Sequence, residues 1–237
     1  MSGERPSLAS GDARVRMMLV RLWNLLVFTA WLIGPFVLVG TVRWGAGWGY
    51  LVPLALAVVF HHVYVVRTNP ELARHRRGIG AGSKKWDVVW NIVFWPLMAC
   101  APLAAGFGAR VGTSPMPWAL WPVGLGLLAA GFALSGRAMA VNPHFEGTVR
   151  LQAERSHRVV DAGPYRFVRH PGYVGLILWA AATPFLLRSG VALVPAAVAS
   201  AWIVLRTRLE DSLLRRELPG YIEYARRVPF RLIPGVW

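Results

Sequence analysis

The sequence is short of cysteine and of acidic residues, and both shortages restrict its class. Cys100 is the single cysteine among 237 residues, which excludes an internal disulfide. Its position inside an apolar run predicts a small buried side chain. Asp and Glu number 11 against 26 Lys and Arg, so the formal net charge is +15. In a soluble protein this excess would indicate nucleic-acid binding. Here the cations flank apolar segments, so we expect membrane topology and anionic lipids to explain them, with no nucleic-acid partner.

Long apolar runs are abundant instead. Hydrophobic residues make up 55% of the chain, and several runs reach the roughly 20 residues that a helix needs to cross a hydrocarbon core. Many of the 12 Trp residues flank these runs, as in an interfacial aromatic belt. We therefore predict an all-α integral membrane helical bundle with about six transmembrane helices. The expected spans are 19–39, 48–66, 88–107, 118–141, 172–187 and 191–205.

The runs also suggest how the chain is divided. Residues 1–18 are polar, without the apolar segment of a cleavable signal peptide, and are expected to form a disordered cytosolic tail. Residues 19–141 are expected to form a four-span N-terminal membrane bundle. Residues 142–237 are expected to form a catalytic region, in which Arg188-Ser189-Gly190 turns a tight transmembrane hairpin and a cytosolic helix and tail follow.

The positions of the cations predict the orientation in the membrane. Most Lys and Arg residues lie in segments 1–21, 67–87, 142–171 and 206–237, which share one side in a six-span topology. The connections on the other side contain only Arg43, Arg110 and Arg188. Because cytoplasmic loops carry the excess of Lys and Arg, we expect both termini and a cofactor pocket formed by these segments to lie in the cytosol.

The stretch Gly163–Gly175 (GPYRFVRHPGYVG) lies just before the fifth expected span. Its two X-Pro bonds restrict the preceding residues to extended or turn geometry, and it gathers Arg166, Arg169 and His170 within five residues. A basic loop that only fixes topology is one interpretation. A rigid polar site at the membrane surface is the other.

This stretch resembles the signature of the isoprenylcysteine carboxyl methyltransferase family, a group of integral-membrane methyltransferases, and the chain looks like a bacterial-type member. The resemblance covers about residues 67–237, and its motifs in combination are more specific than any one of them. The other matching segments are Asn69–Leu72, Lys84–Asp87, Asn142–Phe145, Thr148–Gln152, Glu210–Leu214, Leu218–Tyr224 and Arg231–Trp237.

The resemblance implies a methyl transfer from S-adenosyl-L-methionine to a lipophilic substrate that reaches the site sideways from the bilayer. It implies a catalytic contact to the substrate at Arg206. It implies cofactor contacts at Gln152, His157, Arg158, Val159, Val160, Tyr165, His170, Pro171, Gly172, Tyr173 and Glu210. No metal site is expected. The sequence departs from the family at Glu210-Asp211, where many members have two glutamates, and the spacing to Tyr221 is one residue shorter.

The residues themselves allow the same chemistry. Arg206 and Glu210 are four apart and so share one helix face. They could form an ordinary intrahelical salt bridge, or a pocket in which Glu210 binds the cofactor's ammonium and Arg206 binds an acceptor carboxylate. Such a carboxylate is already ionised and needs no general base. A phospholipid amine or another small lipophilic acid or thiol is the alternative acceptor. An amine acceptor would need a general base, and His144 or His157 could serve.

Other interpretations stay open. A shared His-Pro-x-Tyr element also suggests an NADPH-dependent membrane reductase, although such reductases are longer, and a non-enzymatic membrane protein is the third class. His61-His62 could bind a metal but is expected to hydrogen-bond within the bundle or reach the membrane surface. Gly124, Gly126 and Gly131 are expected to be helix-packing positions rather than a dinucleotide fingerprint.

Overall fold

The computed structural model describes residues 8–75, 84–113, 115–149 and 157–237, and every regular element in them is a helix. This confirms the all-α prediction. The elements are α1 (Leu8–Val39), α2 (Gly45–Thr68), α3 (Pro70–His75), α4 (Lys85–Val111), η1 (Trp118–Leu120), α5 (Trp121–Val141), η3 (Gly163–Arg166), α6 (Pro171–Leu186), α7 (Leu193–Glu217) and α8 (Tyr221–Arg227). The expected boundary at residue 18 falls inside α1.

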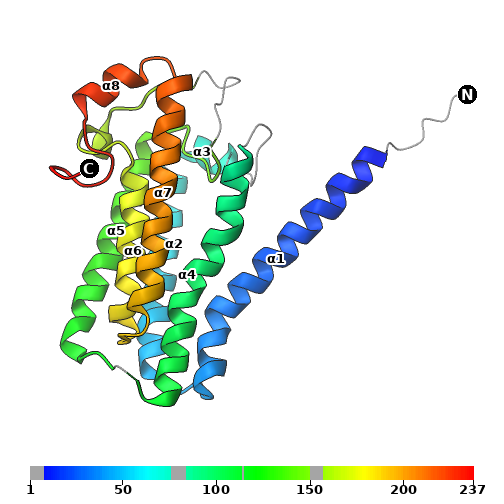
Figure 1. The fold of residues 1–237 in the computed structure, drawn as a ribbon, viewed down its shortest axis with the longest axis vertical. Coiled ribbons are helices and arrows are strands. Elements are labelled where there is room, and N and C mark those ends of the chain that lie inside the picture. The colour runs from blue at the N-terminus through cyan, green and yellow to red at the C-terminus, as the bar shows by residue number, and fades with distance from the viewer. Residues whose placement is uncertain (1–7, 76–83, 114, 150–156) are drawn as a thin grey trace, which may run out of the picture.

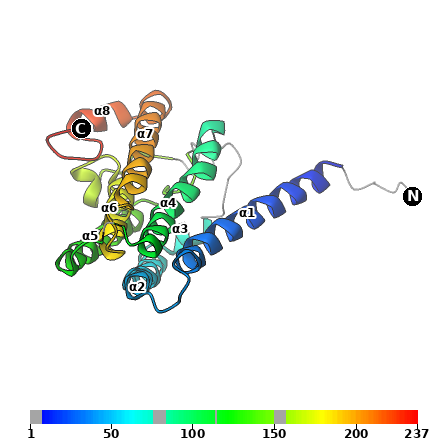
Figure 2. The same cartoon turned by 60° about the horizontal axis from the view of Figure 1, so that its bottom comes forward.

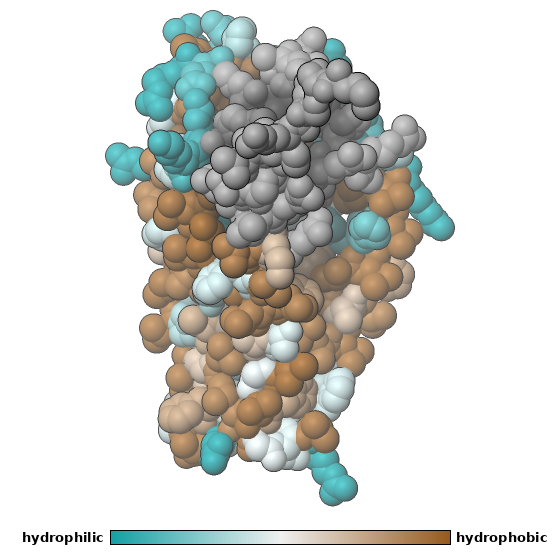
Figure 3. Space-filling model, turned by 90° about the vertical axis from the view of Figure 1, so that its right-hand side faces the viewer, coloured by the Kyte–Doolittle hydropathy of each residue, from teal (hydrophilic) through white to brown (hydrophobic). Residues whose placement is uncertain are grey.

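Four helical stretches in the described residues are long and apolar enough to cross a membrane. They are 22–39 of α1, 45–68 of α2, 85–111 of α4 and 118–141, which joins η1 to α5. α6 is apolar but only 16 residues long, and α7 carries charged residues through its second half. The face in Figure 3 is largely hydrophobic along its length, and the hydrophilic residues that it shows gather mainly toward the upper end. The chain is therefore a multi-pass membrane protein with four clear candidate spans, and the expected count of six is not reached by length and composition.

The helices form one elongated bundle in which α5 packs along α6, and α7 packs against both α6 and α4 (Figure 1). α2 covers α5 on the outside. The C-terminal part of α1 contacts α4, and the N-terminal part of α1 diverges from the bundle, as two views show (Figures 1 and 2). The core lies between α4, α5, α6 and α7 and includes Phe94, Leu128, Leu186 and Ile203.

Glycines let α5 approach α6 closely. A Cβ atom on Gly131 would lie 2.7 Å from the carbonyl oxygen of Gly175, and one on Gly124 would lie 2.9 Å from the amide nitrogen of Leu186. The helix-packing prediction is confirmed for these two positions, because no larger side chain fits between the backbones. It is wrong for Gly126, where a Cβ would meet nothing within 4 Å.

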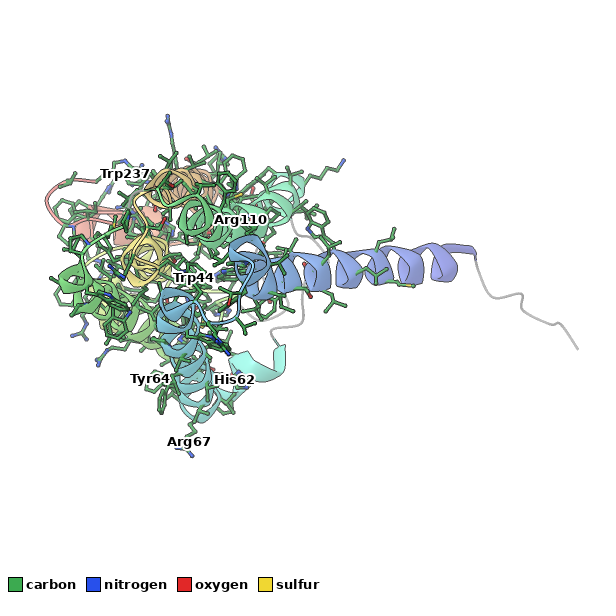
Figure 4. The ribbon with its side chains drawn as sticks, turned by 90° about the horizontal axis from the view of Figure 1, so that it is seen from below. Trp44, His62, Tyr64, Arg67, Arg110 and Trp237 are labelled. Atoms are coloured by element: carbon green, nitrogen blue, oxygen red, sulfur yellow. The ribbon has the colours of Figure 1, made fainter. Side chains whose placement is uncertain are left out.

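The two ends of the bundle differ in their connections. Short turns at the lower end join α1 to α2, α4 to η1 and α6 to α7, and Figure 4 views this end with Arg110 labelled. Arg188 there donates from Nε to the carbonyl oxygen of Met116 at 3.0 Å and lies over the Trp118 ring. The upper end holds α3, η3 and α8 together with the segment 157–170 (Figure 1).

The paired histidines of α2 and the single cysteine lie in the membrane-spanning part of the bundle. His61 Nδ1 lies 3.2 Å from the carbonyl oxygen of Phe132, so this histidine hydrogen-bonds within the bundle as expected. His62 and Tyr64 lie on opposite sides of α2 (Figure 4), and the Tyr64 ring lies beside Gly136 of α5. The side chain of Cys100 is exposed, so the prediction of a buried thiol was wrong; it lies on the outer face of an apolar helix.

Candidate functional site

A cavity of about 230 Å³ lies between α4, α5, α6 and α7, where they meet the segments 142–149 and 157–160. One part of its wall is apolar and is formed by Trp90, Phe94, Trp95 and Leu176. Trp95 is also 37% exposed on the outside of the bundle, so this wall is one side chain thick. The rest of the wall, called the polar wall below, contains the charged and polar lining residues among some apolar ones, and it includes most of the residues singled out above.

The His170-Pro171 bond forms the corner at which the polar wall joins α6. Pro171 takes the first position of the helix, where its missing N–H costs nothing. The backbone of the preceding two residues pairs with the C-terminal segment. The Arg169 amide donates to the carbonyl oxygen of Phe230 and the His170 amide to that of Arg231, both at 3.0 Å. The corner is thus held from both sides, and His170 itself is buried at 6% exposure.

Asp211 on α7 binds this corner from below. Its fully buried carboxylate accepts hydrogen bonds from Arg169 Nε at 2.7 Å, Arg231 Nε at 2.9 Å, Arg215 Nε at 3.0 Å and the Tyr221 hydroxyl at 3.0 Å. His170 Nε2 lies 3.5 Å from the same carboxylate. Burial alone would raise the pKa of Asp211, but hydrogen bonds and positive charge from His170 and Arg169 hold that pKa well below its usual range.

Glu210, the neighbour of Asp211, faces the cavity instead. It accepts a short hydrogen bond from the Tyr173 hydroxyl. Its Oε1 lies 4.0 Å from His170 Nδ1, and its side chain is 20% exposed. A carboxylate, an imidazole and a phenol from two helices therefore meet at one point of the wall.

Arg206 does not form the expected alternative of an intrahelical salt bridge with Glu210. Its Nη2 lies 2.9 Å from Oδ1 of Asp87, on α4, and donates to the carbonyl oxygen of Gly147 at 2.9 Å. The guanidinium carbon lies 4.2 Å from the centre of the Trp90 ring and 5.4 Å from that of Tyr173. Arg206 lines the cavity although it is only 5% exposed.

The opposite side of the polar wall contains Tyr165 and two histidines. The Tyr165 hydroxyl accepts a hydrogen bond from Asn142 Nδ2 at 3.0 Å, and burial raises the pKa of this tyrosine, so the phenol stays protonated. The rings of His144 and His157 lie with their centres 4.5 Å apart. All of these side chains line the cavity.

The structure thus brings most of the predicted site residues around one cavity. Those that line it are Arg206, His157, Arg158, Val159, Val160, Tyr165, His170, Gly172, Tyr173 and Glu210. Pro171 begins α6 and does not line the cavity, and Gln152 lies outside the described residues. Their roles as ligand contacts remain predictions.

Sequence reasoning gave no role to Asp87 and Asp211. Asp87 was assigned to a loop, whereas it is fully buried in the first turn of α4. The sequence did contain a signal for both residues. Acidic residues are scarce in this chain, and a carboxylate beside an apolar run needs a positively charged or hydrogen-bonding partner.

Residues 126–216 match the model of the isoprenylcysteine carboxyl methyltransferase family. Over these residues the chain is similar to members of this family. It is 34% identical over 120 residues to the protein-S-isoprenylcysteine O-methyltransferase of Xenopus laevis, covering 48% of this chain and 41% of that one. It is 28% identical over 116 residues to protein-S-isoprenylcysteine O-methyltransferase B of Arabidopsis thaliana, covering 47% of this chain and 58% of that one.

The chain therefore spans about half the length of these curated relatives. A longer match of another name is the cobalt-zinc-cadmium resistance protein CzcN of Cupriavidus metallidurans. It is 30% identical over 162 residues, covering 67% of this chain and 63% of that one. The residues that the family model matches contain α6 and most of α7, and both helices contribute side chains to the cavity wall.

Proposed function

We propose that the chain is an S-adenosyl-L-methionine-dependent membrane methyltransferase that methylates a carboxyl group on an isoprenylcysteine-like lipophilic substrate. One observation carries this proposal. A single cavity joins a polar wall, built from the family's motif residues, to an apolar wall of Trp90, Phe94 and Leu176. A polar cofactor and a lipid-like acceptor would meet at the junction of these walls.

The polar wall fits the cofactor's chemistry. Glu210 offers a carboxylate to an amino group, and it is already oriented by Tyr173. His170 stands at the N-terminus of α6, where anionic groups are favoured, and so suits the cofactor's carboxylate. Tyr165 and Tyr173 offer ring faces for an adenine or a sulfonium. When bound, the cofactor supplies an electrophilic methyl group.

The residues of the chain would then orient the cofactor and the acceptor and exclude water from the site. An acceptor carboxylate is ionised at neutral pH and needs no base. Arg206 is placed to hold it, because its Nε is buried and finds no hydrogen-bond partner among the described residues. The aromatic faces of Trp90 and Tyr173 restrict the guanidinium to one position. In-line positioning in a site shielded from water would supply the rate enhancement.

We propose a cytosolic location for this site and for both termini. Six spans result if α6 and the apolar first half of α7 cross the membrane as a hairpin. The gathering of Lys and Arg at the end that holds α8 supports this orientation. Substrate would reach the cavity sideways from the membrane lipids, past the half-exposed Trp95.

A second acceptor class is an amine, as in a phospholipid head group. The adjacent rings of His144 and His157 at the cavity wall support this alternative, because one of them could remove the amine's proton. A carboxylate acceptor could be bound by the positively charged Arg206, whereas an amine acceptor could not. A screen that compares prenylcysteine analogues with phosphatidylethanolamine separates the two.

Calorimetric titration of the detergent-purified protein with S-adenosylhomocysteine tests the function, with NADPH as the control. We expect saturable binding of S-adenosylhomocysteine alone. NADPH binding would replace this proposal by a membrane reductase. A folded protein that binds neither molecule, and transfers no methyl group to any acceptor offered, would be a non-enzymatic membrane protein.

A further inference from the structure

Asp87 lies behind the cavity rather than in its wall. It is fully buried and does not line the cavity, whereas Arg206, its partner, does. The Asp87 carboxylate accepts a hydrogen bond from the Val149 amide through Oδ2 at 2.7 Å, while its Oδ1 faces Arg206 in an ion pair without a hydrogen bond. Because Arg206 in turn donates to the carbonyl oxygen of Gly147, α4, α7 and the segment 147–149 form a closed ring of contacts. Asp87 can therefore influence the site only through the groups that it holds.

The group with most consequence is the guanidinium of Arg206, which has two carboxylates within reach. Asp87 binds it across the helix interface, and Glu210 lies one turn along the same helix, the spacing at which oppositely charged side chains pair. A buried guanidinium that loses one counterion is driven toward another, because an uncompensated buried charge is costly. In this structure Asp87 holds Arg206, and Glu210 remains free to accept from Tyr173 and to face the cavity.

We propose that Asp87 is a positioning residue that keeps Arg206 away from Glu210, and so reserves Glu210 for the cofactor and Arg206 for the acceptor. This inference rests on the proposed function. A carboxylate suits the position, because its Oδ2 accepts from the Val149 amide and the negative charge on its Oδ1 faces the guanidinium at 2.9 Å. An asparagine of the same size accepts one of these and turns its own amide hydrogens toward the other.

The test uses the affinity for S-adenosylhomocysteine and needs no acceptor. Asp87→Asn frees Arg206 to pair with Glu210, so we expect the affinity to fall about tenfold, within the range typical of coupling between interacting sites. Arg206→Gln alone is expected to retain wild-type affinity. The double variant is expected to regain most of the affinity that Asp87→Asn loses, because the competing cation is gone. Calorimetry of the four full-length proteins in detergent gives this cycle directly.

Glu217→Gln is the matched control, because Lys84 and Glu217 also pair α4 with α7, at 3.1 Å, but with both side chains about one third exposed. We expect that variant to bind as wild type does. Affinity unchanged by Asp87→Asn would overturn the inference. So would an equally weak double variant, since that result assigns Asp87 a purely structural role. Absence of binding by the wild type would instead refute the proposed function. The two outcomes can be told apart, because the inference about Asp87 is tested only when the wild type binds S-adenosylhomocysteine. Circular dichroism of each variant checks that the helices form.

Discussion

Replacing Asp211 by asparagine should loosen both the His170-Pro171 corner and the C-terminal segment. The carboxylate binds Arg169, Arg215 and Arg231 as well as Tyr221, and Arg169 is only 3% exposed. Removing one partner of a buried ion pair costs about 3–5 kcal/mol, because the other charge stays buried without compensation. For a chain of this length each kcal/mol lowers the melting temperature by roughly 2–4 °C. We therefore expect a decrease on the order of 10 °C.

Cofactor affinity should fall in the same variant. His170 lies 3.5 Å from the Asp211 carboxylate through Nε2, and its backbone amide is bound to the C-terminal segment that Arg231 anchors. A loosened segment leaves His170 without a fixed orientation toward Glu210. The expected result is weaker binding of S-adenosylhomocysteine together with the lower melting temperature.

Acid should reproduce part of this effect in the wild type. The folded-state pKa of Asp211 lies below its unfolded value, so its contribution to stability is complete above the ordinary carboxyl pKa of about 4. That contribution is lost as the pH falls from there toward the folded-state pKa. We expect the difference in melting temperature between wild type and Asp211→Asn to shrink below about pH 4.

Differential scanning fluorimetry in detergent, from pH 7 to pH 3, measures both effects. Asp161→Asn is the matched control, because Asp161 pairs with Arg227 at 3.0 Å while both side chains are more than half exposed. Such a pair contributes at most about 1 kcal/mol. An Asp211→Asn protein that melts within 2 °C of the control would refute the account of Asp211 as the anchor of this corner.

Three further predictions follow from the same structure. Glu210→Gln should abolish S-adenosylhomocysteine binding in calorimetry without changing the helical circular dichroism; retained binding would place the ammonium site elsewhere. Gly131→Leu should cost about 1–3 kcal/mol by forcing α5 from α6, while Gly126→Leu, in open space, should melt as wild type does; equal melting of the two would contradict the close approach. In a cysteine-free background, Arg110→Cys should react with an impermeant thiol reagent in intact cells and Arg226→Cys only after permeabilisation; the reverse pattern would invert the topology.

Local sequence features predicted the parts of the site that are local. The two prolines of the stretch 163–175 restrict the backbone wherever it lies, and this stretch does form a wall of the cavity, through Tyr165, His170 and Tyr173. The spacing of Arg206 and Glu210 correctly placed both on one face of one helix that lines the cavity. Such features need only neighbouring residues, so a single sequence contains them.

Partners that come from distant segments could not be read from the sequence. Arg206 pairs with Asp87 rather than with Glu210 because α4 and α7 lie side by side, and no local pattern encodes that neighbourhood. The hydrogen bonds to Asp211 likewise join α7 to α8 and to two loops. The length of membrane spans was predictable only where apolar runs are long. α7 passes from apolar to charged residues within one continuous helix. A rule based on hydropathy therefore ends the predicted span at the last apolar residue, although the helix continues beyond it.

The position of these residues along α7 explains how one helix can serve three purposes. Arg206 and Glu210 are one turn apart and face the cavity together, whereas Asp211 is rotated by about 100° and faces the corner and the C-terminal segment. The proposed acceptor contact, the proposed cofactor contact and the Asp211 anchor therefore all lie on one continuous helix. A shift of α7 along its axis would move all three at once. Because Asp87 pairs this helix with α4 and Asp211 pairs it with the His170 corner, we expect the two buried aspartates to oppose such a shift.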